Sequence, residues 1–377
     1  MTEIRTSCTE KQAEIRPKRD ASVDALRCLL MFLIVLHHAA CHGFWKADTD
    51  HWLMPIFFTA LIYWHVDAFL AISGWYGVRF SLQRYFSLFG VIAFWSLAKL
   101  VVLYLTKQPV PFEQCLSDGC WSGGWFGNTY LAFIFIAPIL NAAMEALAKL
   151  ERKQVLIIWG VFNAGMILNW APCQLFSGVC AKGGEGFSIL TFISVYLNVR
   201  LVRLLSLDNY FSRKTAVAGV ALFVLGFLCF SVPVAIQSYL KKGFIEHLDW
   251  VGYTTYNSPH SIIMAIVVLL FFVKFVHLPR FISAIVEKIA PLMFGVYILH
   301  EGTLIGRAFF IFPETWLAGH TRLHMMFIVF VSAGFTFVVC TMLDALRRVM
   351  VAPLKSVVMP RLKRLDQKLG FSGGNKK

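Results

Sequence analysis

The sequence predicts an all-α, polytopic transmembrane helix bundle of about ten helices with both termini in the cytoplasm. Hydrophobic residues make up 58% of the 377 residues and charged residues only 15%, with a mean hydropathy of +0.66. This composition is far too apolar for a soluble chain. Apolar windows long enough to cross a hydrocarbon layer of about 30 Å recur along the chain. Basic residues gather on one side of these windows.

The predicted helices are separated by polar segments that carry most of the charge. The first helix should act as an uncleaved anchor, because the polar and basic residues 1–24 precede no short apolar region with a small-residue cleavage site. Pro138 interrupts the fourth helix, and His300 lies inside the ninth. In chain order the predicted helices are 25–43, 52–77, 85–106, 124–146, 154–171, 186–206, 215–237, 259–279, 289–306 and 323–346.

The distribution of Lys and Arg predicts the orientation. With the N-terminus inside, 26 of the 35 basic residues fall on the cytoplasmic side and 7 on the other, while Arg27 and Lys99 lie within helices. The chain then divides into a cytoplasmic N-terminal segment (1–24), a transmembrane helix bundle (25–346) and a basic cytoplasmic tail (347–377). Membrane lipids are the expected partner of the tail, which should lie along the anionic leaflet. The net charge of +14 therefore implies no nucleic-acid partner.

Four of the nine cysteines fall in pairs within predicted outer loops, Cys115 with Cys120 and Cys173 with Cys180. In an oxidising compartment each pair could form a disulfide. Small, unpaired packing residues are the other interpretation, and the sequence leaves both open.

Arg27 and His38 lie eleven residues apart in the first predicted helix. At about 100° per residue, His38 lies about 20° round from Arg27, whereas His37 points about 80° away. Arg27, Met31, Ile34 and His38 therefore form one stripe, with His38 roughly 16 Å deeper along the axis. Titratable groups inside a membrane helix are functional candidates. The alternative is that Arg27 extends to the interface and His38 is a packing residue.

The second predicted helix ends near two further arginines. Arg79 and Arg84 follow the segment that contains Ser73, at a predicted cytoplasmic helix junction. Together they could bind the phosphates of a nucleotide or coenzyme, or they could be ordinary positive-inside flanking residues. Asp67 lies well inside the apolar segment, where a carboxylate needs a partner.

Two more polar clusters occur near predicted helix ends. Trp125 and Tyr130 precede Asn141 in the fourth helix, and such aromatics either form an interfacial belt or offer flat faces to a sugar.

The other cluster, Tyr297, His300 and Glu301, combines a phenol, an imidazole and a carboxylate within little more than one turn, with Arg307 about two turns further on. It could handle protons or bind an acceptor, or it could be a structural polar contact between helices.

Several catalytic signatures are missing from the sequence. It has no Walker-type loop, no His-Glu-x-x-His, no paired Cys-x-x-Cys and no Gly-x-Ser-x-Gly. ATP-driven, zinc-dependent and hydrolytic chemistry are therefore disfavoured, and no metal is expected.

Taken together, these residues resemble the acyltransferase type 3 family of integral membrane O-acyltransferases. The resemblance spans roughly residues 20–345. It rests on motifs that follow one another in the family's order: Asp24-x-x-Arg27 with His38, Phe69-x-x-x-Ser73-Gly74, Trp125-Phe126 with Tyr130, Pro138 with Asn141, and Tyr297-x-x-His300-Glu301 with Arg307. Many members carry two arginines three positions apart after the Ser-Gly segment, whereas Arg79 and Arg84 are five apart.

The resemblance implies a standalone enzyme of the bacterial cytoplasmic membrane. It would move an acetyl or other short acyl group from cytoplasmic acyl-CoA to a hydroxyl of a cell-surface or exported glycan, or of a lipid-linked saccharide. Arg27 and His38 would be catalytic, and Ser73, Arg79 and Arg84 would bind acetyl-CoA. The expected acceptor-binding residues are Asp67, Trp125, Tyr130, Asn141, Tyr297, His300, Glu301 and Arg307.

Two mechanistic alternatives follow. His38 could act as a general base on the acceptor hydroxyl, because an imidazole exchanges protons near neutral pH, or it could carry the acyl group covalently. A different class of protein, a proton-coupled transporter or flippase, would use Arg27, His38, Asp67 and Glu301 as a relay. The inverted repeats typical of such folds are not found in the sequence.

Overall fold

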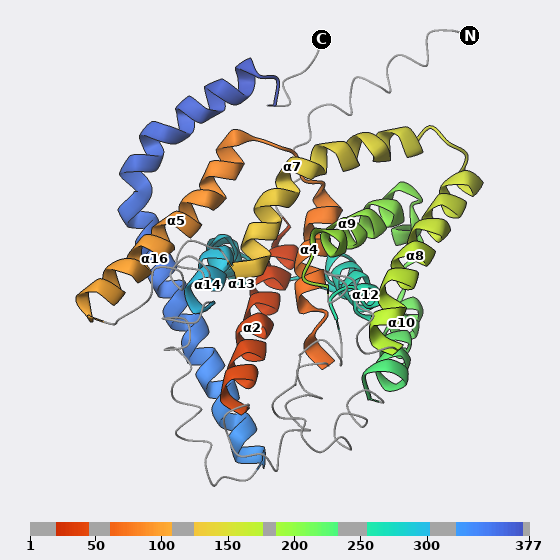
Figure 1. The fold of residues 1–377 in the computed structure, drawn as a ribbon, viewed down its shortest axis with the longest axis horizontal. Helices are drawn as coiled ribbons and strands as arrows, with labels where there is room; N and C mark the ends of the chain where they lie inside the picture. The colour runs from red at the N-terminus through yellow and green to blue at the C-terminus, as the bar shows by residue number, and fades with distance from the viewer. Residues whose placement is uncertain are drawn as a thin grey trace.

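The protein folds into a bundle of helices (Figure 1). The computed structural model describes residues 20–44, 61–107, 124–175, 186–232, 255–301 and 322–371. Within these ranges it contains helices and turns but no strand. The α-helices are α2 (Ala21–Phe44), α4 (His65–Tyr76), α5 (Leu82–Leu105), α7 (Gly124–Leu147), α8 (Arg152–Leu175), α9 (Ile189–Leu204), α10 (Arg213–Gly226), α12 (Pro259–Phe275), α13 (Arg280–Ile289), α14 (Met293–His300) and α16 (Arg322–Lys368).

Each of the ten predicted ranges overlaps a helix of the structure. Seven helices in the described part of the chain are long and apolar enough to cross a membrane, which confirms a polytopic helical bundle. The ninth predicted helix, 289–306, differs from the structure in its bounds. In the described residues it corresponds to η6 (Ala290–Leu292), a 3-10 turn that contains Pro291, and to α14. An amphipathic helix that the sequence did not predict, α13, precedes this turn.

Helix α2 lies at the centre of the bundle (Figure 1). Its apolar window is 61% buried, against at most 44% for the other candidate spans. It packs against α4, α12, α13, α14 and α16. The stripe predicted on this helix is confirmed as an interior feature, because Met31 and Ile34 are buried and Arg27 and His38 are only partly exposed.

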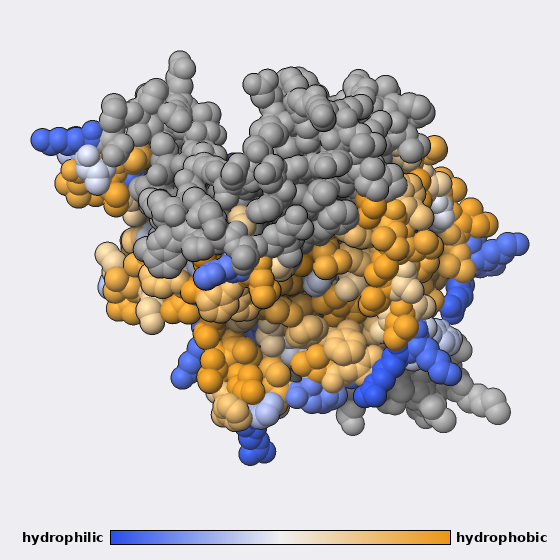
Figure 2. All heavy atoms as spheres, turned by 90° about the horizontal axis from the view of Figure 1, so that it is seen from below, coloured by the Kyte–Doolittle hydropathy of each residue, from blue (hydrophilic) through white to orange (hydrophobic). Residues whose placement is uncertain are grey.

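The outer helices expose large apolar side chains, including Leu97, Val161 and Phe327. Figure 2 shows that such side chains cover much of the described part of the visible face, with hydrophilic side chains projecting at its edges. Exposed apolar surface on this scale is expected where lipid is the neighbour.

A buried polar network joins three helices. Asp344 on α16 is fully buried and accepts a hydrogen bond from Trp95 Nε1 on α5 (3.0 Å). Arg347 binds both oxygens of the same carboxylate, at 2.7 and 3.0 Å. A Cβ atom on Gly295 of α14 would overlap this carboxylate, so glycine is required for α14 to approach so closely. The network ties the C-terminal helix to the helices that surround α2.

Helix α16 continues to Lys368, well past the predicted end of the last span at residue 346. Near its C-terminal end, the buried Asp366 accepts hydrogen bonds from Ser81 Oγ (2.7 Å), Leu82 N (2.7 Å) and Gln83 N (3.1 Å). The carboxylate thus caps the N-terminus of α5, where backbone N–H groups have no partner within the helix. The end of α16 is thereby held beside the junction of α4 and α5.

Candidate active site

Five of the predicted site residues line one small pocket. Arg27, Ser73, Arg79, Arg84 and Tyr130 surround a cavity of about 180 Å³ between α2, α4, α5 and α7. The hydroxyls of Ser73 and Tyr130 lie 3.0 Å apart, within hydrogen-bonding distance. We call this cavity the arginine pocket. Three guanidinium groups around one space favour an anionic ligand, and a phosphate suits their geometry.

Arg27 is held in place by its own helix. Its Nη1 donates to Asp24 Oδ1 at 2.6 Å, and Asp24 is fully buried. The guanidinium also lies 5.9 Å from the centre of the Tyr76 ring. The Arg27 side chain nevertheless remains 31% exposed, so it can contact a ligand in the pocket without leaving Asp24.

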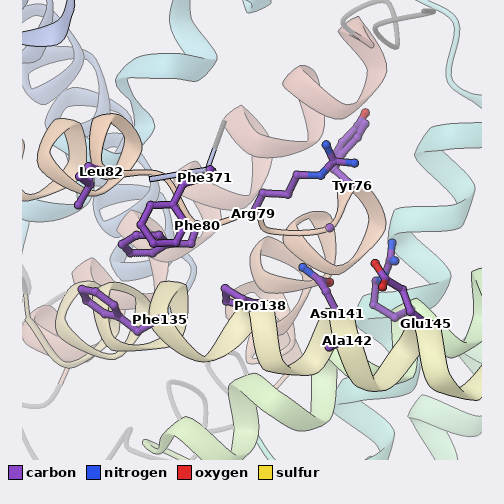
Figure 3. A pocket seen from close by; sticks show the side chains of 13 residues that line it. Tyr76, Arg79, Phe80, Leu82, Phe135, Pro138, Asn141, Ala142, Glu145 and Phe371 are labelled. Carbon is purple, nitrogen blue, oxygen red and sulfur yellow. The ribbon is translucent and has the colours of Figure 1, made fainter. Parts of the chain in front are cut away.

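A larger cavity of about 890 Å³ opens beside the arginine pocket (Figure 3). The two cavities share Tyr76, Gly77 and Arg79. We call the larger one the wide pocket. Its remaining lining residues are Phe80, Leu82, Phe135, Pro138, Asn141, Ala142, Glu145, Arg200, Gly370 and Phe371. Its volume lies within the range of small-molecule sites.

A closed ring of hydrogen bonds shapes the turn between these pockets. Val78 N donates to Tyr196 Oη (3.1 Å), Tyr196 Oη donates to Asn141 Oδ1 (2.6 Å), and Asn141 Nδ2 donates to Val78 O (2.7 Å). Gly77 ends α4 with φ +74°, in the left-handed region that favours glycine. The predicted residue Asn141 therefore holds the turn that carries Arg79, and Tyr196 is a positioning residue that the motifs did not identify.

His38, His300 and Glu301 form a second site further along α2. His38 Nδ1 lies 3.0 Å from His300 Nε2 and 3.1 Å from Glu301 Oε2. His300 Nδ1 lies 2.6 Å from the Val296 carbonyl, which can only accept, so this nitrogen carries a proton. Neutral His300 then presents a lone pair on Nε2, and His38 Nδ1 is the donor to both partners. In this tautomer the lone pair of His38 lies on Nε2, as a general base requires.

The end of α14 that carries Glu301 is stabilised by a buried lysine. Lys99 Nζ on α5 donates to the carbonyls of Ile298 (2.7 Å) and Glu301 (2.6 Å), which lack partners at a helix C-terminus. Its signal in the sequence is a lone cation inside an apolar helix. On the other side, a Cβ on Gly124 would lie 2.8 Å from Tyr297 Oη and 2.9 Å from Glu301 Cγ. The start of α7 therefore packs directly against this site.

Trp125, at the start of α7, belongs to a group of stacked aromatic rings. Trp125 stacks on Tyr256 (ring centres 5.1 Å apart), and Tyr256 stacks on Tyr63 (4.2 Å). The Tyr63 ring packs in turn against His37 (5.4 Å). His37 thus belongs to this aromatic cluster, in agreement with its different direction on α2. Neither Tyr63 nor Tyr256 belongs to a sequence motif. Their ring contacts join residues far apart in the chain and therefore leave no local sequence pattern.

Asp67 is buried on α4, 1% exposed. Among the residues that the structure describes, its Oδ2 atom has no hydrogen-bond partner. The partner expected from the sequence is thus not seen for this atom.

Aromatic contacts connect the arginine pocket with the histidine site. The Tyr130 ring packs on Phe126 (5.9 Å), Phe126 on Tyr297 (5.6 Å), and Tyr297 on His300 (6.0 Å). The two sites therefore share one wall, formed by α7 and α14, in addition to the common helix α2. Arg307, Cys115, Cys120, Cys180 and the side chain of Cys173 lie outside the described residues, so the predictions for them stay predictions.

The donor atoms of His38, His300 and Glu301 lie within 4.8 Å of one another, close enough to ligate a metal ion in principle. The hydrogen bonds of His38 Nδ1 to both neighbours already account for this proximity. The geometry therefore fits a proton-handling triad as well as a metal site.

Comparison with known proteins bears on the whole bundle. A search of curated proteins and a search of solved structures returned no match. A comparison with protein families matches residues 20–345 to an acyltransferase domain. The matched range contains both sites and all the motifs that resemble the type 3 family. The chain belongs to the acyltransferase type 3 family and is a multi-pass membrane acyltransferase.

Proposed function

We propose that this protein transfers an acetyl or other short acyl group from cytoplasmic acyl-CoA to a hydroxyl of an exported, cell-surface or lipid-linked glycan, in the bacterial cytoplasmic membrane. The observation that carries the proposal is the pairing of two sites along α2. A pocket with three arginines surrounds one end, and a histidine with an oriented imidazole lies eleven residues further on. At about 1.5 Å per residue this separation is about 16 Å.

The arginine pocket would bind the phosphates of the donor. Arg27, Arg79 and Arg84 approach the pocket from three different elements, and bidentate guanidinium contacts suit phosphate oxygens. The extended pantetheine arm would then follow the wall formed by Phe126 and Tyr297 and bring the thioester to His38. The hydroxyls of Ser73 and Tyr130 lie where this arm would begin.

The transfer step uses His38 as the general base. Nε2 takes the proton of the acceptor hydroxyl while the oxygen attacks the thioester carbonyl carbon. The C–S bond of the tetrahedral adduct then breaks, and His38 returns the proton to the departing thiolate. Glu301 and His300, which both contact His38 Nδ1, stabilise the imidazolium that exists between these two proton transfers. The Tyr297 hydroxyl can donate to the developing oxyanion.

The acceptor would enter from the opposite end of the bundle. The face of Trp125 and the polar groups of Asp67 and Arg307 would select the sugar, although Trp125 already stacks on Tyr256 on one side. The alternative of a transporter receives no specific support from the site and does not fit the family.

The decisive experiment incubates the purified protein with radiolabelled acetyl-CoA and candidate glycans. Label that appears on a glycan hydroxyl supports the proposal. Movement of glycan across proteoliposomes without label would instead support transport and contradict it.

A further inference from the structure

We infer that the C-terminal segment at the end of α16 forms part of the donor site, where Phe371 contacts the nucleotide of acyl-CoA. This inference rests on the proposed function, because it assigns one part of the donor to the wide pocket. It concerns residues beyond the range 20–345 that the family match covers. The transfer chemistry itself needs none of them.

The segment is anchored rather than loosely apposed. Asp366 is 2% exposed and accepts three hydrogen bonds from Ser81, Leu82 and Gln83. A carboxylate at the N-terminus of a 24-residue helix also interacts favourably with the helix dipole. This contact fixes the direction in which the chain leaves α16 and carries Gly370 and Phe371 to the edge of the wide pocket.

Aromatic rings form one wall of that pocket. Phe371 packs edge-on against Phe80 (4.9 Å), and Phe80 packs against Phe135 on α7 (5.2 Å). Figure 3 shows Phe80 and Phe371 side by side, with Phe135, Pro138 and Asn141 along α7. Phe371 and Phe135 remain 44% and 52% exposed. Exposed ring surface in a pocket that also carries charged side chains is suited to stacking with a flat heteroaromatic base.

Charge in the same pocket favours a nucleotide over an uncharged aromatic ligand. Arg79 and Arg200 line it together with a single carboxylate, Glu145, so positive charge is in excess, and Arg79 also lines the arginine pocket next to it. The Arg200 Nε atom is buried without a hydrogen-bond partner among the described residues. A donor whose base stacks on the exposed face of Phe371 could therefore place phosphates on Arg79 and Arg200 and lead its arm into the arginine pocket.

The test compares two donors that differ only in the nucleotide, acetyl-CoA and acetyl-pantetheine. Phe371→Ala should raise KM for acetyl-CoA about tenfold, the usual scale for losing one base-stacking ring, and leave KM for acetyl-pantetheine within twofold. Asp366→Ala, which releases the segment, should reproduce this pattern. Leu369→Ala is the matched control, because Leu369 is exposed on the same segment and does not line the pocket.

Direct binding of coenzyme A, measured by calorimetry, makes the inference independent of any acceptor. Weaker binding by Phe371→Ala than by Leu369→Ala supports the inference even if no glycan is acylated, an outcome that would contradict only the proposed function. If Phe371→Ala raised KM equally for both donors, or did not raise KM for acetyl-CoA, the inference would be overturned and the proposed function would stand.

Discussion

His38 and His300 are 262 positions apart in the sequence, yet His38 Nδ1 and His300 Nε2 lie 3.0 Å apart. The Val296 carbonyl determines the tautomer of His300, and this in turn determines which nitrogen of His38 carries the proton. The lone pair of the His38 imidazole is therefore on Nε2 before any substrate binds.

Replacing His38 by Gln should lower kcat by two or more powers of ten, because the variant lacks the general base. The rate of acetyl transfer under donor saturation is the measurement, with elution volume in gel filtration as a check on folding. His277→Gln, at an exposed position outside the site, is the control and should retain the wild-type rate. Full activity of His38→Gln would exclude His38 as the base.

Incubation with labelled acetyl-CoA alone should leave the protein unlabelled, because direct transfer needs the acceptor hydroxyl. Rapid quenching followed by gel electrophoresis measures bound label. Hydroxylamine-sensitive label in the wild type that disappears in His38→Gln would instead establish an acyl-histidine intermediate.

Arg79→Gln should raise KM for acetyl-CoA about 10- to 100-fold, the scale of losing a hydrogen bond to a charged group. The effect of Arg84→Gln should be smaller, because Arg79 lines both pockets and Arg84 only one. Initial rates against donor concentration provide the comparison. Arg152→Gln, which removes an exposed arginine that lines neither pocket, serves as the control. A larger effect at Arg84 than at Arg79 would contradict this assignment.

Asp344→Ala should destabilise the folded protein by about 3–5 kcal/mol, because it leaves Arg347 buried without its partner. Asp344→Asn keeps an acceptor for Trp95 and should be less harmful. Unfolding in detergent, followed by intrinsic fluorescence, measures both. Glu151→Ala removes an exposed carboxylate and should have little effect. A wild-type melting curve for Asp344→Ala would show that the network contributes nothing.

Removal of metal ions should leave the transfer rate unchanged, because the proposed step uses proton transfer through His38 alone. The rate is measured after dialysis against a chelator and after readdition of Zn²⁺. If activity fell with the chelator and returned with Zn²⁺, His38, His300 and Glu301 would be metal ligands rather than a proton-handling triad.

The fold was largely predictable because each membrane helix must satisfy its own backbone and therefore requires a long apolar segment. Such segments can be found one at a time. Helix α13 is not predicted by such a segment, because polar and apolar residues are interspersed from Arg280 to Ile289 and only one face of the helix is apolar. The extension of α16 past residue 346 is not predicted either, because proline usually ends a helix, whereas α16 contains both Pro353 and Pro360.

The site was predictable where a motif lies on one helix. Arg27 and His38 share a face of α2, and their spacing of eleven residues is enough to predict this shared face. Contacts across the bundle were not predictable in this way. Lys99 meets the end of α14 about 200 positions later, and Trp95 meets Asp344 after 249. Side-chain chemistry identifies such residues as unusual, but only the packing of the helices selects their partners.

The central position of α2 has a consequence for substrate range. Arg27, which would bind phosphate, and His38, which would lie beside the thioester, are on one unbroken helix. The distance between them is therefore fixed. Donors with a shorter or longer arm would present the wrong atom to His38. In the proposed mechanism, variation among acyl groups would be accommodated beyond His38, so one end of α2 would select the length of the donor arm and the other end the size of the acyl group.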